Sequence, residues 1–176
     1  AMRAQGAFEQ AIESYRRAIT LDPNHADAHF NLASTCLALG QFEPGWEAYQ
    51  WQWRRKEAKP RLFTPSSWDG SALAGRNLFL HVEQGLGDEL FFLRFVNALR
   101  HRGVGEIIYL ANPKIAPLLR RSTAVDRIAS LEEKPSKENL VLSGGDLPRL
   151  LGMKHADQIP PPITLTALAD RLAEMQ

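Results

Sequence analysis

The sequence predicts an α + α/β protein, in which a helical hairpin precedes an open parallel sheet with flanking helices. Three observations predict this class. Glycine, aromatic and small residues recur at a spacing of 34 positions in the first third of the 176-residue chain. A stretch rich in proline, glycine and serine follows at residues 56–75. Apolar runs of strand length then alternate with helical patterns, which favours parallel strands joined by right-handed crossovers.

The repeat is carried by residue types that match 34 positions apart. The matching pairs are Gly6 and Gly40, Phe8 and Phe42, Ala11 and Gly45, and Tyr15 and Tyr49. Pro23 separates two helical patterns, and Asn24 is the expected N-cap of the second. This order of residues resembles the tetratricopeptide repeat. The resemblance implies that this part of the chain binds a protein or peptide partner.

The register of the repeat shows how much of an array is present. Residues 1–21 supply only the second helix of one repeat, and one full repeat follows at residues 26–55. Arrays of this kind usually need about three repeats for stability. We therefore expect a fragment whose earlier repeats are missing, or repeats that pack against another part of the protein.

The second helix of the full repeat carries an aromatic stripe. Its members stand three and four positions apart: Phe42, Trp46, Tyr49 and Trp53. Aromatic stripes are usually packed against a core. We expect this helix to end the array and to dock on the next domain, and an exposed groove for a peptide is the alternative.

The chain is expected to divide into a repeat region at residues 1–57, a linker at residues 58–76 and a Rossmann-like α/β domain at residues 77–176. Phe63 and Trp68 are expected to pin the linker to a surface. The expected strands cover residues 77–83, 106–111, 125–129 and 139–142. The expected helical segments cover residues 88–102, 113–121, 146–151 and 164–175.

Composition argues against several classes of function. The net charge of +1 gives no reason to expect nucleic acid as a partner. No apolar run approaches the roughly 18 residues of a membrane-spanning helix, and the first residues do not read as a signal peptide, so a cytoplasmic location is expected. The one cysteine, Cys36, excludes an internal disulfide. The histidines show no metal-ligand spacing, so no metal is expected. No cofactor is expected either.

The loop E-Q-G-L-G-D, residues 83–88, lies between the first expected strand of the α/β domain and its helix. In an open α/β sheet, ligands bind beyond the carboxyl ends of the strands. Gly85 and Gly87 let the backbone turn and approach a ligand closely, and the free amides of the helix start favour an anion. Glu83 and Gln84 are further candidates for substrate binding.

The loop does not match the common nucleotide-binding fingerprints. Leu90 stands where the dinucleotide fingerprint requires its third glycine, and no Lys-Ser or Lys-Thr follows as in a phosphate-binding P-loop. A purely structural interpretation makes Asp88 the N-cap of the helix, with Glu89 favouring the helix dipole. His81, on the preceding strand, is expected to be a packed core histidine.

Four motifs occur in order along the chain: G-W-E-A-Y-Q-W-Q-W-R, W-D-G-S-A-L-A-G-R-N-L-F-L, E-Q-G-L-G-D and L-S-G-G-D-L-P-R-L-L-G. Together they resemble bacterial proteins that join tetratricopeptide repeats to a heptosyltransferase-like glycosyltransferase domain. The resemblance implies a GT-B fold of two Rossmann-like domains. It also implies inverting transfer of a sugar from a nucleotide-sugar to an acceptor, without an obligatory metal. Asp88 matches the candidate catalytic base on the acceptor hydroxyl.

The resemblance implies that a second Rossmann-like domain, about 150 residues long, holds most of the donor nucleotide-sugar. This chain would then be the last repeats and the acceptor-side half, which folds but does not turn over alone. The helix start lowers the pKa of an aspartate and burial raises it, so burial beneath the second domain would favour the base. The alternatives are a non-catalytic binding module, in which the repeats bind a peptide and the α/β domain is a scaffold, and a degenerate, purely structural transferase half.

Overall fold

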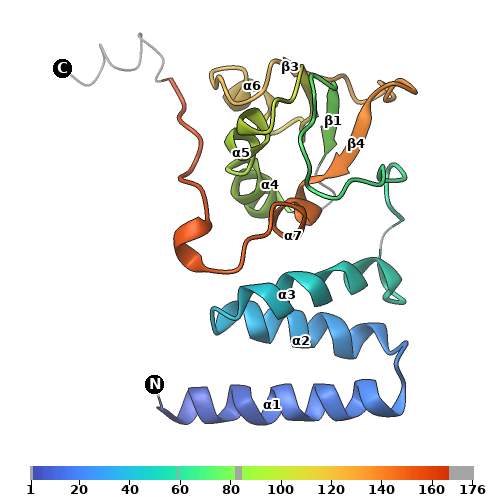
Figure 1. Cartoon of the computed structure of the whole chain (residues 1–176), viewed down its shortest axis with the longest axis vertical. Helices are drawn as coiled ribbons and strands as arrows, with labels where there is room; N and C mark the ends of the chain where they lie inside the picture. Colours follow the sequence, from blue (N-terminus) through green and yellow to red (C-terminus); the bar gives the residue numbers. More distant parts are fainter. Residues whose placement is uncertain (1, 59, 82–84, 167–176) are drawn as a thin grey trace, which may run out of the picture. The chain divides into compact units, whose positions relative to one another are not determined.

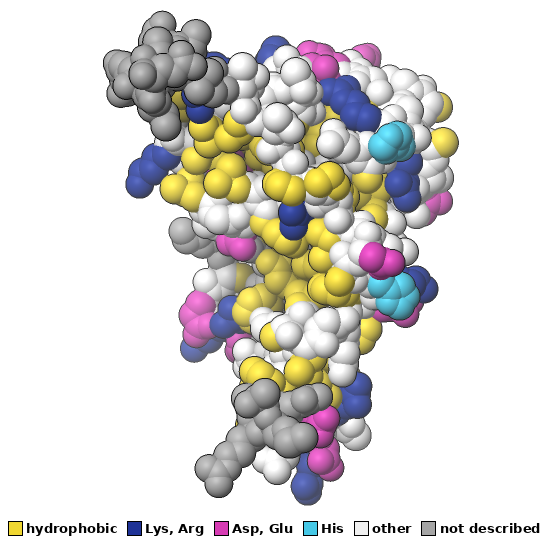
Figure 2. Space-filling view, turned by 90° about the vertical axis from the view of Figure 1, so that its left-hand side faces the viewer, with side chains coloured by type: hydrophobic (Ala, Val, Ile, Leu, Met, Phe, Trp, Pro, Cys, Tyr) yellow, Lys and Arg dark blue, Asp and Glu magenta, His cyan; other side chains and the backbone are white. Residues whose placement is uncertain are grey.

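A computed structural model describes residues 2–58, 60–81 and 85–166 of the chain. The chain separates into two units, each assembled from two segments (Figure 1). Unit 1 comprises Ala1–Leu62 and Pro148–Ile159, and unit 2 comprises Phe63–Leu147 and Pro160–Gln176. On the face in Figure 2, basic and acidic side chains are interspersed, in agreement with the nearly balanced charge of the sequence.

Unit 1 is built on three helices. These are α1 (Met2–Leu21), α2 (Ala26–Ala38) and α3 (Phe42–Tyr49), and α3 runs on into the 3₁₀ helix η1 (Gln50–Arg54). His25 caps α2, because its Nδ1 accepts the N–H of Ala28 at 3.3 Å, so the expectation that Asn24 is the cap was wrong. Helices α2 and α3 approach closely at Gly45, where an added Cβ would lie 2.7 Å from Leu37 Cδ2.

Of the aromatic stripe on α3 and η1, Trp46 is buried, and Phe42, Tyr49 and Trp53 are half-buried. Trp46 is 7% exposed and meets the ring of Tyr49 edge-on at 5.6 Å. Residues of the returning segment 148–159 line a cavity of about 110 Å³ together with Trp46; among them are Arg149, Gly152 and Met153. A segment that follows the sheet in sequence therefore covers the end of the repeat hairpin.

Unit 2 contains a four-stranded, all-parallel open sheet (Figure 1). Its strands are β1 (Leu78–His81), β2 (Ile107–Leu110), β3 (Arg127–Ile128) and β4 (Leu140–Ser143), in the order β3-β2-β1-β4. The predicted fold class is confirmed. Strand β1 is an interior strand, with β2 on one side and β4 on the other, so the strand order reverses beside β1.

Helices and turns connect the strands. They are α4 (Leu86–Leu93), α5 (Val96–His101), α6 (Ala116–Leu119), η2 (Gly144–Asp146), α7 (Leu147–Leu150) and η3 (Ala156–Gln158). The single helix expected at residues 88–102 is instead two helices, because the backbone leaves the α pattern at Arg94 and Phe95. Of the final helix expected at residues 164–175, the part up to residue 166 is not helical, and the rest lies outside the described residues.

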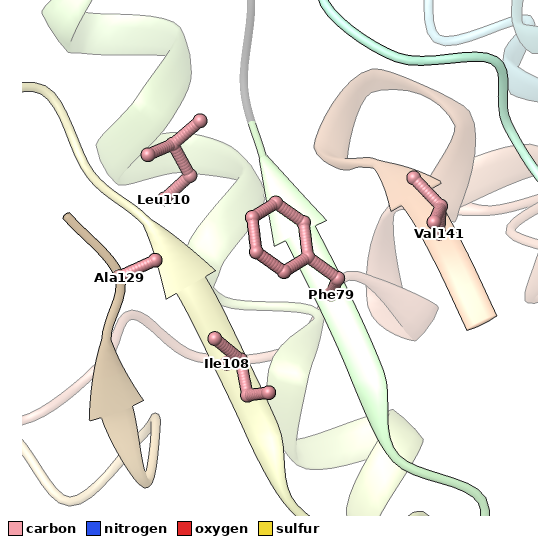
Figure 3. Packing of buried hydrophobic residues seen from close by; sticks show 5 residues of the cluster. All are labelled: Phe79, Ile108, Leu110, Ala129 and Val141. Atoms are coloured by element: carbon pink, nitrogen blue, oxygen red, sulfur yellow. The ribbon is translucent and has the colours of Figure 1, made fainter. Parts of the chain in front are cut away.

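The two faces of the sheet are covered differently. On one face lies a cluster of buried apolar residues: Phe79, Ile108, Leu110, Ala129 and Val141 (Figure 3). Phe63 packs against this cluster, with its ring 5.4 Å from that of Phe79. The adjoining segment also follows the edge strand β4, since Ser66 exchanges hydrogen bonds of 2.8 and 2.9 Å with the backbone of Val141. Tyr109 faces α4, because its hydroxyl donates a hydrogen bond to Glu89 of that helix.

Candidate functional site

The candidate site lies at the carboxyl ends of β1 and β4. Ligands of open α/β sheets bind where the strand order reverses, in the crevice beyond these ends. In this sheet the reversal falls between β1 and β4. The loop after β1 leads into α4, the turn after β4 is η2, and α4 contacts η2. The glycine-containing loop therefore occupies the place in unit 2 where the topology favours a ligand.

Asp88 lies in the first turn of α4 and is exposed. The helix begins two residues earlier than expected, with Gly85 in the N-cap position, so the N-cap interpretation of Asp88 was wrong. Asp88 is the third residue of the helix, and its Oδ2 accepts a hydrogen bond from the backbone N–H of the N-cap residue Gly85 at 3.2 Å. This bond is one half of a capping box and stabilises the first turn of α4. The described groups donate no hydrogen bond to the second carboxylate oxygen, Oδ1.

The two glycines of the loop are open to solvent. An added Cβ on Gly87 would meet no atom within 4 Å, and one on Gly85 would meet only Asp88 Oδ2, at 3.4 Å. Neither glycine has a positive φ. Crowding and backbone strain therefore do not account for glycine at these two positions. The predicted substrate-binding residues Glu83 and Gln84 lie outside the described residues.

Glu89 is the prominent polar residue that the sequence did not identify. Its side chain is 2% exposed, and its Oε1 accepts two hydrogen bonds, from Tyr109 Oη at 3.0 Å and from the backbone N–H of Asn112 at 2.8 Å. Burial raises the pKa of Glu89, while the bonds from Asn112 and Tyr109 act in the opposite direction. Burial and the neighbouring carboxylate also raise the pKa of Tyr109, which keeps its hydroxyl protonated as a donor.

This network fixes the geometry around the loop. Tyr109 belongs to β2, and Asn112 follows that strand directly. By accepting from both, Glu89 ties the first turn of α4 to the carboxyl end of β2. The neighbouring Asp88 is thereby carried on a helix whose start is anchored to the sheet. The sequence signal was an acidic residue inside an apolar helical pattern, which had been interpreted only as a favourable charge at the helix start.

Other polar residues surround the end of β1. His81 is fully buried, as expected, and meets the ring of Phe63 at 5.3 Å. Its register partner on β4 is Ser143, which is 1% exposed, and Asp146 in η2 is 8% exposed. Among the described residues, the site thus combines the exposed Asp88 with buried polar side chains near the ends of β1 and β4. In unit 1, Cys36 is fully buried and burial raises the pKa of its thiol, which disfavours a nucleophilic role.

Comparison with known proteins supports the assignment of the first part of the chain. Residues 1–40 match the family model described as the TPR repeat. The N-terminal helices are tetratricopeptide repeats, and repeats of this family suggest a protein partner. The match covers less than half of the chain.

Similarity to one curated protein covers more of the chain than the family model does. The chain is 35% identical over 97 residues to Protein FlbA of Caulobacter vibrioides, which covers 53% of this chain and 16% of FlbA. The chain therefore matches only about a sixth of the length of that relative. No solved structure matches the chain. Among the described residues, no helix is both long and apolar enough to cross a membrane.

Proposed function

We propose that this chain is the end of a repeat array joined to the acceptor-side half of an inverting glycosyltransferase. The observation that carries the proposal is the place of Asp88. It is an exposed carboxylate in the first turn of α4, the helix that follows the interior parallel strand β1, where the strand order reverses. The resemblance of the ordered motifs to heptosyltransferase-like proteins supplies the reaction class.

Asp88 is the proposed general base. Inversion takes one displacement, so one group must accept the proton of the acceptor hydroxyl as its oxygen attacks the anomeric carbon. Oδ2 is held by the N–H of Gly85, which orients the carboxylate. Oδ1 is then the oxygen that takes the proton. The nucleoside diphosphate leaves from the opposite side of the sugar, as the C–O bond to the donor phosphate breaks.

We expect the substrate to come close to the backbone at the two loop glycines, Gly85 and Gly87. Because the space beside Gly87 is empty, a sugar or acceptor hydroxyl can come close to the backbone there. The free N–H groups at the start of α4 favour a partial negative charge on the substrate. Glu83 and Gln84 remain proposed substrate-binding residues on the strength of the sequence alone.

The test is release of nucleoside diphosphate from a panel of nucleotide-sugars by the full-length protein, with cell extract as acceptor. Asp88→Asn keeps the shape of the side chain and the bond from Gly85, and removes the base. We expect it to lower the rate by about 10²- to 10⁴-fold. Asp157→Asn, at an exposed aspartate of unit 1, is the matched control and should leave the rate unchanged. Equal rates for the wild type and Asp88→Asn would remove Asp88 from the chemistry.

A non-catalytic protein-binding module is the second candidate. The match of residues 1–40 to the TPR repeat favours it, together with an open cavity in unit 1. In this case the α/β unit is a scaffold, and no nucleotide-sugar is consumed under any acceptor condition. Binding of a protein partner that is unchanged by Asp88→Asn, without release of nucleoside diphosphate, would favour this candidate.

A further inference from the structure

Unit 1 has an open cavity of about 630 Å³ at the end of the helical hairpin. Its walls come from the first turn of α2, from α3, from the 3₁₀ helix η1 and from Arg61. The volume lies within the range of roughly 300–1,000 Å³ that is usual for ligand pockets. The cavity is therefore large enough for several side chains of a bound segment.

Basic side chains stack on the aromatic rings that line this cavity. The His29 ring stacks on Trp51, with centroids 3.8 Å apart and planes 2° apart. The guanidinium of Arg54 lies 4.5 Å from the Trp51 ring centroid, and that of Arg61 lies 4.4 Å from the ring of Trp53. Stacking on the Trp51 face holds the guanidinium of Arg54 in place, and its N–H groups point outward from the edges of the guanidinium plane.

The charge of the cavity is predominantly positive. Two arginines, Arg54 and Arg61, line it against one carboxylate, Glu47. Among the described residues, Arg54 forms no ion pair. The adjacent Arg55 provides a contrast, because its Nε contacts Asp27 Oδ1 at 2.7 Å and its guanidinium covers the ring of Phe30. Arg54 thus keeps its donors for a group that comes from outside.

We propose that this cavity binds an acidic segment of a partner protein, with an aspartate or glutamate of that segment on Arg54. A lone inorganic anion would fill little of the volume. The remaining wall is formed by Pro44, Ala48 and the tryptophan rings, which suit the apolar side chains of a peptide. Tryptophan and arginine are also the residue types that dominate binding energy at protein interfaces. The inference rests on protein binding by the repeats and not on the transferase chemistry at Asp88.

The test begins with a random octapeptide library displayed on phage and selected on this chain. We expect the selected peptides to be enriched in aspartate and glutamate. A synthesised peptide from the selection should bind at least about tenfold more tightly than its Asn/Gln counterpart, since charge-assisted hydrogen bonds are the strong ones. It should also shift the indole N–H NMR signals of Trp51 and Trp53, while those of Trp46 and Trp68, which do not line the cavity, serve as internal controls.

Two matched variants locate the contact. Arg54→Gln should weaken binding at least about tenfold, whereas Arg17→Gln removes the same charge from an exposed position on α1 and should change it less than about twofold. Selected peptides without acidic enrichment, or equal affinities of both variants, would overturn the proposal. Binding that shifts only other tryptophans would also overturn it, while leaving protein binding by the repeats intact. None of these outcomes depends on the Asp88→Asn assay, so the two proposals fail separately.

Discussion

The buried carboxylate of Glu89 leads to a prediction about pH. Glu89→Gln keeps an oxygen that can accept from Tyr109 and Asn112, and it removes the titration. The folded pKa of Glu89 is raised above its ordinary value of 4.5, so the folded state binds a proton more readily than the unfolded chain. The stability linked to this group is then fully present below about pH 4.5 and is lost as pH rises through the folded pKa.

The magnitude follows from the same contacts. Each unit by which the folded pKa exceeds the unfolded pKa corresponds to about 1.4 kcal/mol of unfolding free energy. For each such unit, the stability of Glu89→Gln relative to the wild type should therefore rise by about 1.4 kcal/mol between acidic and neutral pH. Tyr109→Phe deletes a hydroxyl that is fully buried, and water does not replace it, so a loss of about 2 kcal/mol is expected. It also removes a bond that favours the charged form of Glu89, so its loss of stability should grow as pH rises.

The assay is hydrogen exchange of the β2 amides between pH 4 and pH 8, corrected for the intrinsic exchange rate. Tryptophan fluorescence is less suitable, because Trp46, Trp51 and Trp53 lie in unit 1 and only Trp68 lies in unit 2. A difference between the wild type and Glu89→Gln that stays constant over this pH range would refute the reasoning. A double-mutant cycle with Tyr109→Phe measures the coupling between the two side chains.

Three glycine substitutions test the packing. Gly45→Ala should destabilise unit 1 by about 1–2 kcal/mol, measured by urea unfolding with tryptophan fluorescence, because its Cβ would lie 2.7 Å from Leu37 Cδ2. Gly105→Ala should cost more, about 3 kcal/mol by hydrogen exchange of β2, because its Cβ would lie 2.4 Å from the carbonyl oxygen of Gly75; a neutral effect would contradict this contact. Gly87→Ala should leave stability unchanged or raise it by up to about 1 kcal/mol while lowering transferase activity, and full activity would argue against close substrate approach.

The fold could be predicted from local patterns because its elements are local. The spacing of 34 identified the hairpin, and the alternation of strands and helices identified the parallel sheet. The order β3-β2-β1-β4, with β1 as an interior strand, came from the structure, because right-handed crossovers reduce the number of possible strand orders without selecting one. The break at Arg94 and Phe95 could not be predicted, because the apolar pattern continues across it and contains neither glycine nor proline.

The site could be predicted only in part. The loop and Asp88 stand out in the sequence, and their place beyond β1 follows from the fold. Glu89 was missed because its donors, Tyr109 and Asn112, lie 20 and 23 residues away in sequence. The apolar Leu90 is 38% exposed, whereas the acidic Glu89 beside it is buried. Only contacts between distant residues decide which of two adjacent side chains enters the interior.

The interleaved segments of the two units have a consequence for synthesis and for truncation. Residues 148–159 belong with the repeat hairpin, so the hairpin lacks part of its cover until the ribosome has made the whole sheet. A chain cut after residue 62 would retain every repeat helix and still leave Trp46 without Arg149, Gly152 and Met153 beside it. Folding of the repeat hairpin is therefore completed only by a segment that follows the sheet in sequence. A cut at the sequence boundary between the repeats and the sheet would yield an uncapped hairpin that is prone to self-association.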